Sequence, residues 1–214
     1  MAALNNFFLT RIFCGNYANA SVEAEKLIVL AEEKGAAYWK ACGTLHQGGL
    51  KALTGSPEDA VRMITAGISA FKATGSTLWM PMHLSYLARA YAALGRFGEA
   101  WDCIRGALET IDETKETWFE AEANRVAGEI ALMSPEPDLA KAQACFERAL
   151  AVAREQEAKS WELRAAMSMA RLWRDQGKPQ QARELLAPVY GWFTEGFDTL
   201  DLRQAKALLD KLAQ

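Results

Sequence analysis

The chain has few cysteines, few histidines and few prolines. Of its 214 residues, four are cysteine, two are histidine and six are proline. The cysteines are far apart and form no CxxC pair, so they do not suggest a disulfide framework. They fall in segments that we expect to be helical, as small hydrophobic residues of a cytoplasmic protein. These cysteines are Cys14, Cys42, Cys103 and Cys145.

The sequence also lacks a long hydrophobic segment and an excess of basic charge. The one candidate for a targeting segment, residues 4–14, is interrupted by Asn5, Asn6 and Arg11 and is too short to span a bilayer. The net charge is −3, and acidic and basic residues are interspersed. Binding to nucleic acid or to an anionic membrane normally needs a basic surface. We therefore expect neither as a partner.

Motifs of catalysis and of metal binding are absent as well. There is no GxxxxGK[ST] phosphate loop and no paired-aspartate metal site of the cyclase kind. Neither His46 nor His83 lies in a serine or cysteine nucleophile motif. Cys42 precedes His46 by one helical turn, but no further acid or cysteine nearby completes a set of four metal ligands. We expect no enzyme activity, no metal and no cofactor, and we expect both histidines to pack between helices.

What the sequence does contain is a repeat of about 40 residues. Five alanines recur at intervals of 40, 40, 42 and 40 residues: Ala20, Ala60, Ala100, Ala142 and Ala182. A fixed period of this size is typical of a solenoid, in which helical hairpins bury their apolar faces by stacking on one another. Large aromatic residues near the start of the first helix in the last four hairpins keep the same spacing, and we expect them to fill the space between repeats: Trp39, Trp79, Phe119 and Trp161.

The pattern predicts an all-α fold, one right-handed α-solenoid domain over residues 1–214. The first helix of the third hairpin is expected at 77–94, and the second helix of the fifth at 179–195, with a kink at Pro188. An amphipathic last helix would cap the array. The five expected hairpins span 3–34, 36–73, 77–113, 116–156 and 158–195, and the capping helix spans 200–212.

Glycines within one expected helix indicate where backbones approach each other. Gly43, Gly48 and Gly49 lie in the helix expected at 36–54, where each glycine costs about 1 kcal/mol of helix propensity. Either very close packing or a recess in the surface would explain them. We expect close packing.

The third hairpin resembles a tetratricopeptide repeat. Its small and large residues follow the order Leu84-x3-Ala88-x2-Tyr91-x3-Gly95-x-Phe97-x2-Ala100-x3-Ile104-x2-Ala107. In this pattern small residues let the helices approach and large ones fill the gaps between them. The chain departs from the family in two ways: the tryptophan lies near the start of the first helix, and the period exceeds the usual length of about 34 residues.

Longer strings resemble one group of proteins that contain such repeats. These are large bacterial proteins that join a class III adenylate/guanylate cyclase domain, an AAA-type ATPase domain and a C-terminal tetratricopeptide array. The resemblance spans most of the chain and implies a regulatory region that binds a partner or effector and passes that state to catalytic domains. The strings are EAE at 120–122 leading to Arg125 and Glu129, CFERAL at 145–150, AKSWELRAA at 158–166, ARLW at 170–173 and, most specific, LAPVYGWFTEGFDT at 186–199.

The resemblance also implies where a ligand would bind. In tetratricopeptide arrays the first helices line a concave groove, and arginines there could hold the carboxylates of an acidic peptide. Alternatively, the charged residues pair with one another. The expected function is a non-catalytic protein-interaction and regulatory scaffold that binds a protein, a peptide or other domains of its parent protein. The alternative is a domain that senses a small-molecule effector in the groove. The candidate groove residues are Ser85, Arg89, Glu122, Arg125, Glu129, Arg164, Met167 and Arg171.

The start of the array differs from its end. The aromatic position that should precede Ala20 by the repeat spacing falls before Met1, so the first hairpin is truncated relative to the pattern. We expect an exposed apolar edge, further repeats upstream in a longer parent protein, and a homodimer formed through this edge in the isolated chain. The edge would consist of Leu4, Phe7, Phe8 and Ile12.

Overall fold

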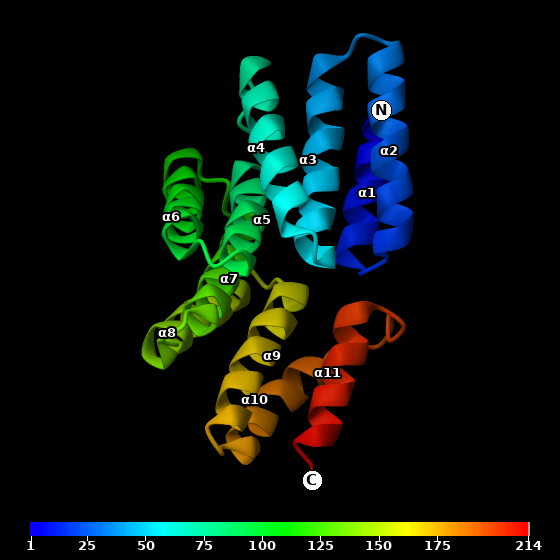
Figure 1. Ribbon diagram of the computed structural model, residues 1–214. Coiled ribbons are helices and arrows are strands. Elements are labelled where there is room, and N and C mark those ends of the chain that lie inside the picture. Colours follow the sequence, from blue (N-terminus) through cyan, green and yellow to red (C-terminus); the bar gives the residue numbers. More distant parts are fainter. Residues whose placement is uncertain (214) are drawn as a thin grey trace. The chain divides into compact units, whose positions relative to one another are not determined.

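The computed structural model describes residues 1–213, and its regular elements are all helices (Figure 1). No strand occurs in these residues, so the all-α fold class is confirmed. Gln214, the last residue of the expected domain, lies outside the described part. The helices are α1 (Ala2–Phe13), α2 (Tyr17–Glu33), α3 (Ala37–Thr54), α4 (Pro57–Ala73), α5 (Met80–Ala93), α6 (Phe97–Thr114), the short 3-10 helix η1 (Thr117–Phe119), α7 (Glu120–Met133), α8 (Leu139–Glu155), α9 (Lys159–Asp175), α10 (Pro179–Gly191) and α11 (Leu200–Lys211).

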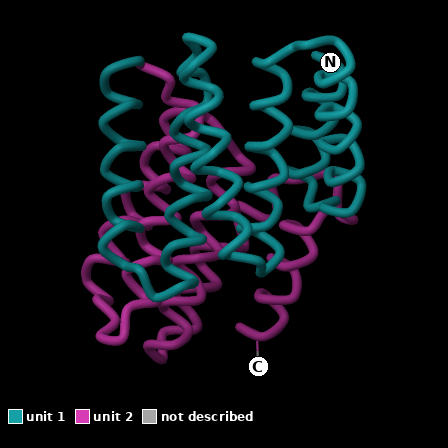
Figure 2. The backbone as a smooth tube through the Cα atoms, turned by 45° about the horizontal axis from the view of Figure 1, so that its top comes forward, with its two compact units in different colours: residues 1–114 teal, residues 115–214 magenta. Residues whose placement is uncertain are grey.

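The chain forms two compact units, Met1–Thr114 and Lys115–Gln214 (Figure 2). In unit 1 the helices pack as the pairs α1/α2, α3/α4 and α5/α6, and the first helices α1, α3 and α5 contact one another in order. In unit 2 the pairs are α7/α8 and α9/α10, and α11 contacts both α9 and α10. The helix pairs agree with the expected hairpins, whereas the regular solenoid and the single domain stay predictions.

The five alanines of the repeat occupy one equivalent place in five helices. Each is the fourth residue of the second helix of a pair, and each is 0% exposed. The backbone N–H of each alanine donates to the carbonyl of the residue just before its helix, at 2.9–3.1 Å. The side chain at this position is fully buried in the first turn of the second helix. A larger residue there would push the paired helices apart. The spacing of the alanines therefore follows the spacing of the helix pairs.

Three helix ends differ from the expected ones by three or more residues. Helix α7 begins at Glu120 rather than at 116, and the 3-10 helix η1 precedes it. Helix α5 begins at Met80 rather than at 77, because Trp79 adopts a left-handed backbone conformation with φ 62° that no α-helix can contain. Helix α10 ends at Gly191 rather than at 195, three residues after Pro188, which lies inside it. Proline supplies no N–H for the helical ladder, so the last turn of this helix is weakened.

The three glycines of α3 lie where neighbouring helices come closest. A Cβ atom at any of them would overlap a side chain of another helix, so the expected close packing is confirmed and a recess is not present there. The shortest distances from such a Cβ atom would be 2.5 Å to Ile28 at Gly43, 2.6 Å to Ile64 at Gly48 and 2.8 Å to Tyr86 at Gly49.

The expected apolar edge of α1 is wrong for two of its four residues. Phe8 and Ile12 are 1% and 2% exposed, because α1 turns them toward α2 and α3. Leu4 is half-buried, and only Phe7 is exposed, at 57%. Helices α2 and α3 therefore cover most of the apolar face of α1 within unit 1. The homodimer stays a prediction.

The cysteines are all free thiols, but only one is deeply buried. Cys42 is buried, Cys103 and Cys145 are half-buried, and Cys14 is exposed. Burial raises the pKa of the Cys42 thiol to about 11. Within residues 1–213 no helix is both long enough and apolar enough to cross a bilayer.

Candidate functional site

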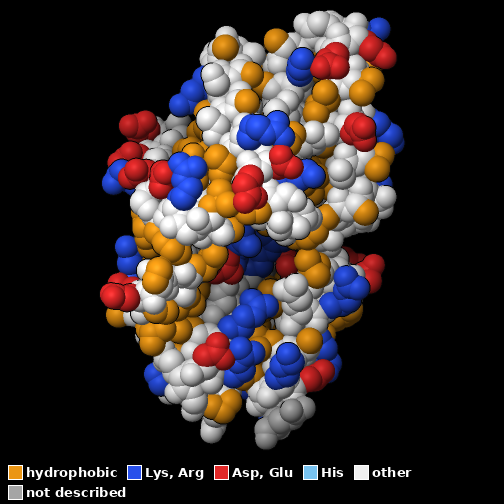
Figure 3. Space-filling model, viewed as in Figure 1, with side chains coloured by type: hydrophobic (Ala, Val, Ile, Leu, Met, Phe, Trp, Pro, Cys, Tyr) orange, Lys and Arg blue, Asp and Glu red, His pale blue; other side chains and the backbone are white. Residues whose placement is uncertain are grey.

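Charged residues of the first helices α7 and α9 and of the last helix α11 meet in unit 2. Helix α9 contacts both α7 and α11, and its residues 164, 168 and 171 share one face because they are spaced by about one helical turn. Figure 3 shows Lys and Arg side chains gathered over α9 and α11 on the face in view. We define the charged strip as Glu122, Arg125 and Glu129 of α7, Arg164, Ser168 and Arg171 of α9, and Asp201 and Gln204 of α11.

Arg125 lies at the centre of the strip and is fully engaged. Its Nε and Nη2 donate to the two carboxylate oxygens of Glu122 at 2.8 and 2.7 Å. Its Nη1 donates to Glu129 and, at 3.2 Å, to the hydroxyl of Ser168 on α9. Burial alone would lower the pKa of Arg125, but the charges of Glu122 and Glu129 outweigh burial and raise it. The same attraction lowers the pKa of Glu122 despite its burial. Arg125 and Glu122 are therefore both ionised at neutral pH.

Arg164 links the strip to the last helix. Its Nε donates to Asp201 Oδ2 at 2.6 Å, and its Nη1 lies 3.6 Å from Glu122 Oε1. The guanidinium also lies over the ring of Trp161, 5.0 Å from the ring centroid. The charged residues are expected either to bind a ligand or to pair with one another. Pairing is confirmed for Arg125 and Arg164. These two side chains hold α7, α9 and α11 together.

Arg171 differs from the other two arginines of the strip. Within residues 1–213 its only hydrogen bond runs from Nη2 to Gln204 Oε1, at 3.4 Å, and it forms no ion pair there. Burial lowers the pKa of Arg171, and the charges of Arg125 and Arg174 lower it further, while Glu129 and Asp201 only partly compensate. The guanidinium therefore has donors to spare and is incompletely neutralised.

The remaining predicted groove residues lie in different surroundings. Ser85 is fully buried in unit 1 and donates its hydroxyl to the Pro81 carbonyl at 2.8 Å. Met167 is 2% exposed and belongs to the core of unit 2. Arg89 is half-buried on α5 of unit 1. The side chains of Ser85 and Met167 are thus unavailable to a ligand at the surface.

Sequence reasoning missed three members of the strip: Ser168, Asp201 and Gln204. Helical spacing from Arg164 and Arg171 could have found Ser168, because these three residues share one face of α9. Asp201 lies in the first turn of the expected capping helix, where an acidic residue is a typical helix-start signal. Nothing local to 200–212 indicates that its carboxylate also pairs with Arg164, which lies 37 residues earlier.

The two histidines lie together in the core of unit 1. His46 Nε2 is 2.7 Å from Asn5 Oδ1, and the His46 ring stacks on Phe8 with centroids 3.9 Å apart. The rings of His46 and His83 are 6.3 Å apart. Burial lowers the pKa of His83 to about 3 and that of His46 well below its usual range. In residues 1–213 no three His, Cys, Asp or Glu side chains are grouped closely enough to hold a metal ion.

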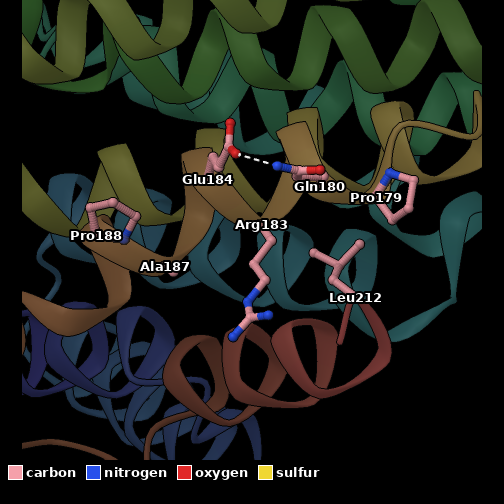
Figure 4. Close-up of a pocket in the computed structure, with 7 residues that line it drawn as sticks. All are labelled: Pro179, Gln180, Arg183, Glu184, Ala187, Pro188 and Leu212. Carbon is pink, nitrogen blue, oxygen red and sulfur yellow. Dashed lines mark hydrogen bonds between the residues drawn. The ribbon is translucent and has the colours of Figure 1, made fainter. Parts of the chain in front are cut away.

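A pocket of about 660 Å³ lies between α10 and α11, at residues that sequence reasoning did not select. Figure 4 shows Arg183 extending from α10 toward α11, while Gln180 donates to Glu184 at 2.9 Å. Within residues 1–213 Arg183 forms no ion pair. The walls are mostly apolar, so the pocket combines apolar surface with one available cation. Its lining residues are Pro179, Gln180, Arg183, Glu184, Ala187, Pro188 and Leu212.

Comparison with known proteins does not assign the chain to a family: no protein-family model matches it, and no curated protein sequence matches it significantly. The resemblances to tetratricopeptide repeats and to the cyclase and ATPase proteins therefore stay predictions from the sequence.

Proposed function

We propose that the protein is a non-catalytic protein-interaction and regulatory scaffold. In this proposal it is a right-handed α-solenoid of five tetratricopeptide-like hairpins, closed by α11. Support comes from the helix pairs, from the contacts between successive first helices within each unit, and from the equivalent positions of the five alanines. Solenoids of this kind present extended surfaces on which a peptide can lie.

The observation that carries the proposal is the state of Arg171. Two arginines of the charged strip are fixed by carboxylates, whereas Arg171 has one long hydrogen bond to Gln204 and no ion pair within residues 1–213. A carboxylate is the natural acceptor for a guanidinium, because both can form two parallel hydrogen bonds. An acidic side chain or the C-terminal carboxylate of a peptide would supply this acceptor, and the fixed neighbours would spare the cost of ordering the site.

The regulatory part of the proposal rests on the family resemblance. In a parent protein with cyclase and ATPase domains, binding at the strip would be passed on through α11, since Arg164 ties α11 to α9 and α7. A ligand can shift such an equilibrium only by its different affinities for the two states.

Fluorescence anisotropy with a short labelled acidic peptide tests the scaffold proposal. A charge-assisted hydrogen bond contributes about 1.5–3 kcal/mol, so Arg171→Gln should weaken binding by about tenfold or more. Arg203→Gln is the matched control, because Arg203 is an exposed arginine of α11 outside the strip. Equal losses in both variants would indicate non-specific attraction and would contradict the proposal, as would no loss in either.

The pocket between α10 and α11 favours the second candidate function, the sensing of a small-molecule effector. Its volume of about 660 Å³ lies in the range of roughly 300–1,000 Å³ that is common for ligand sites. A thermal-shift screen with metabolites tests this alternative. One compound that raises the melting temperature by several degrees, with the effect lost in Arg183→Gln, would favour the sensor over the scaffold.

A further inference from the structure

The connection between α10 and α11 exposes large aromatic side chains. It spans residues 192–199, within the most specific string of the sequence, and Figure 1 shows it as the loop beside the start of α11. Trp192 is 59% exposed and Phe197 is 47% exposed. Tryptophan and other aromatic residues are enriched at the energetically important centres of protein interfaces. Two such rings on one short connection therefore mark a candidate interaction surface.

Several contacts hold these rings in place. The rings of Trp192 and Phe193 meet edge to face with centroids 5.2 Å apart, and those of Tyr190 and Phe197 are 5.9 Å apart. The Thr199 hydroxyl donates to the carbonyl of Gly196 at 2.7 Å and fixes the turn before α11. A surface that is already ordered loses less side-chain entropy when a partner binds.

The face of Trp192 is turned toward a positive charge. Lys159 Nζ lies 6.0 Å from the centroid of the Trp192 ring. The same ammonium pairs with Glu162 at 2.7 Å, so its charge is already matched by a carboxylate. The electron-rich face of an indole attracts cations, and arginine in particular stacks on such rings. The ring chemistry of this connection therefore suits a cationic side chain.

The charges on the connection are acidic. Glu195 and Asp198 are both exposed, and within residues 1–213 neither carboxylate forms a hydrogen bond or an ion pair. Lys159, which lies near the Trp192 ring, pairs with Glu162, and Arg164 pairs with Asp201. Two exposed carboxylates thus lie on the same eight-residue connection as two exposed rings, so a basic partner could interact with both kinds of group.

We propose that the α10–α11 connection is a docking surface for a basic peptide segment. An arginine of the partner stacks on Trp192 or Phe197, and its other cationic groups meet Glu195 and Asp198. This surface shares no residue with the charged strip, so the proposal stands independently of the acidic-peptide site at Arg171.

Fluorescence anisotropy with a short labelled peptide of alternating arginine and glycine tests the proposal on the full chain. A cation–π contact at an exposed site contributes about 0.5–1 kcal/mol, so Trp192→Ala should weaken binding by about two- to fivefold. The double variant Glu195→Gln with Asp198→Asn should weaken it at least as much and flatten its salt dependence. Trp192→Phe keeps an aromatic face and should retain most of the affinity.

Two controls distinguish binding at this surface from non-specific binding to exposed apolar residues and from binding at the charged strip. Leu139→Ala removes a side chain that is 47% exposed on α8 and should leave the affinity unchanged. Arg171→Gln should not weaken binding of the basic peptide. The proposal is overturned if Trp192→Ala and the double variant bind like the wild type, if Leu139→Ala loses as much affinity as Trp192→Ala, or if Trp192→Ala weakens an acidic peptide instead.

Discussion

Mild acid should destabilise unit 1 through its two buried histidines. His46 and His83 are 1% and 2% exposed, and burial lowers the pKa of His83 to about 3 and that of His46 well below its usual range. In the unfolded chain both would titrate near their ordinary pKa of about 6.5. Below that pH the unfolded state binds more protons than the folded state. The stability is therefore complete above about pH 6.5 and falls as the pH drops toward the folded-state pKa values.

The size of the effect follows from this difference in proton binding. One pH unit below the unfolded pKa, each neutral buried histidine costs about 1.4 kcal/mol, so the pair costs about 3 kcal/mol near pH 5.5. The unfolding free energy of a domain is only about 5–15 kcal/mol in total. The pKa values of the paired carboxylates Glu122 and Glu162 are lowered, so their own acid effect begins at lower pH. The range between about pH 7.5 and 5.5 therefore isolates the histidines.

Urea unfolding followed by far-UV circular dichroism at several pH values measures this loss. His46→Gln should remove about half of the pH dependence, because glutamine does not titrate and can still donate to Asn5 Oδ1, which lies 2.7 Å from His46 Nε2. His83→Gln should remove the other half. A wild-type chain whose stability is flat over this range, or variants that keep the full slope, would refute the reasoning.

Two further predictions concern packing and charge in unit 2. A methyl group at Gly128 would overlap the buried ring of Phe146, so Gly128→Ala should lower the unfolding free energy by about 1–3 kcal/mol. Gly106→Ala, which meets only an ordinary contact at 3.7 Å, should raise it by up to about 1 kcal/mol. Glu122→Gln removes the carboxylate that takes two hydrogen bonds from Arg125, although Arg125 keeps Glu129 and Arg164 keeps Asp201, so it should cost about 1.5–3 kcal/mol in urea unfolding. The exposed control Glu25→Gln should change the unfolding free energy by less than about 0.5 kcal/mol.

Helices whose ends are set by local chemistry could be predicted from the sequence. Helix α4 begins at the expected Pro57, because proline fits the first helical turn and acids follow it at Glu58 and Asp59. The start of α5 could not be predicted in this way. Trp79 takes a left-handed conformation that the tryptophan side chain itself does not favour, so the surrounding structure must hold it there.

The burial of α1 shows a second limit of sequence patterns. The periodicity identified Phe8 and Ile12 as one apolar face, but periodicity alone does not say which neighbour covers that face. The deciding contact is polar as well as apolar: Asn5 hydrogen-bonds His46, and Phe8 stacks on the same ring. These contacts join residues about 40 positions apart along the chain. Only the tertiary arrangement shows that α1 completes the core of unit 1.

The charged strip combines both situations. Within α7 the spacing of Glu122, Arg125 and Glu129 makes ion pairs expected, because residues three and four apart share a helix face. The pair between Arg164 and Asp201 depends instead on how α11 packs against α9. Once these pairs form, they use the carboxylates that could otherwise have neutralised Arg171. In the described part of the chain, Arg171 therefore lacks an ion pair because its neighbours pair with one another. Composition and net charge alone do not reveal such a residue.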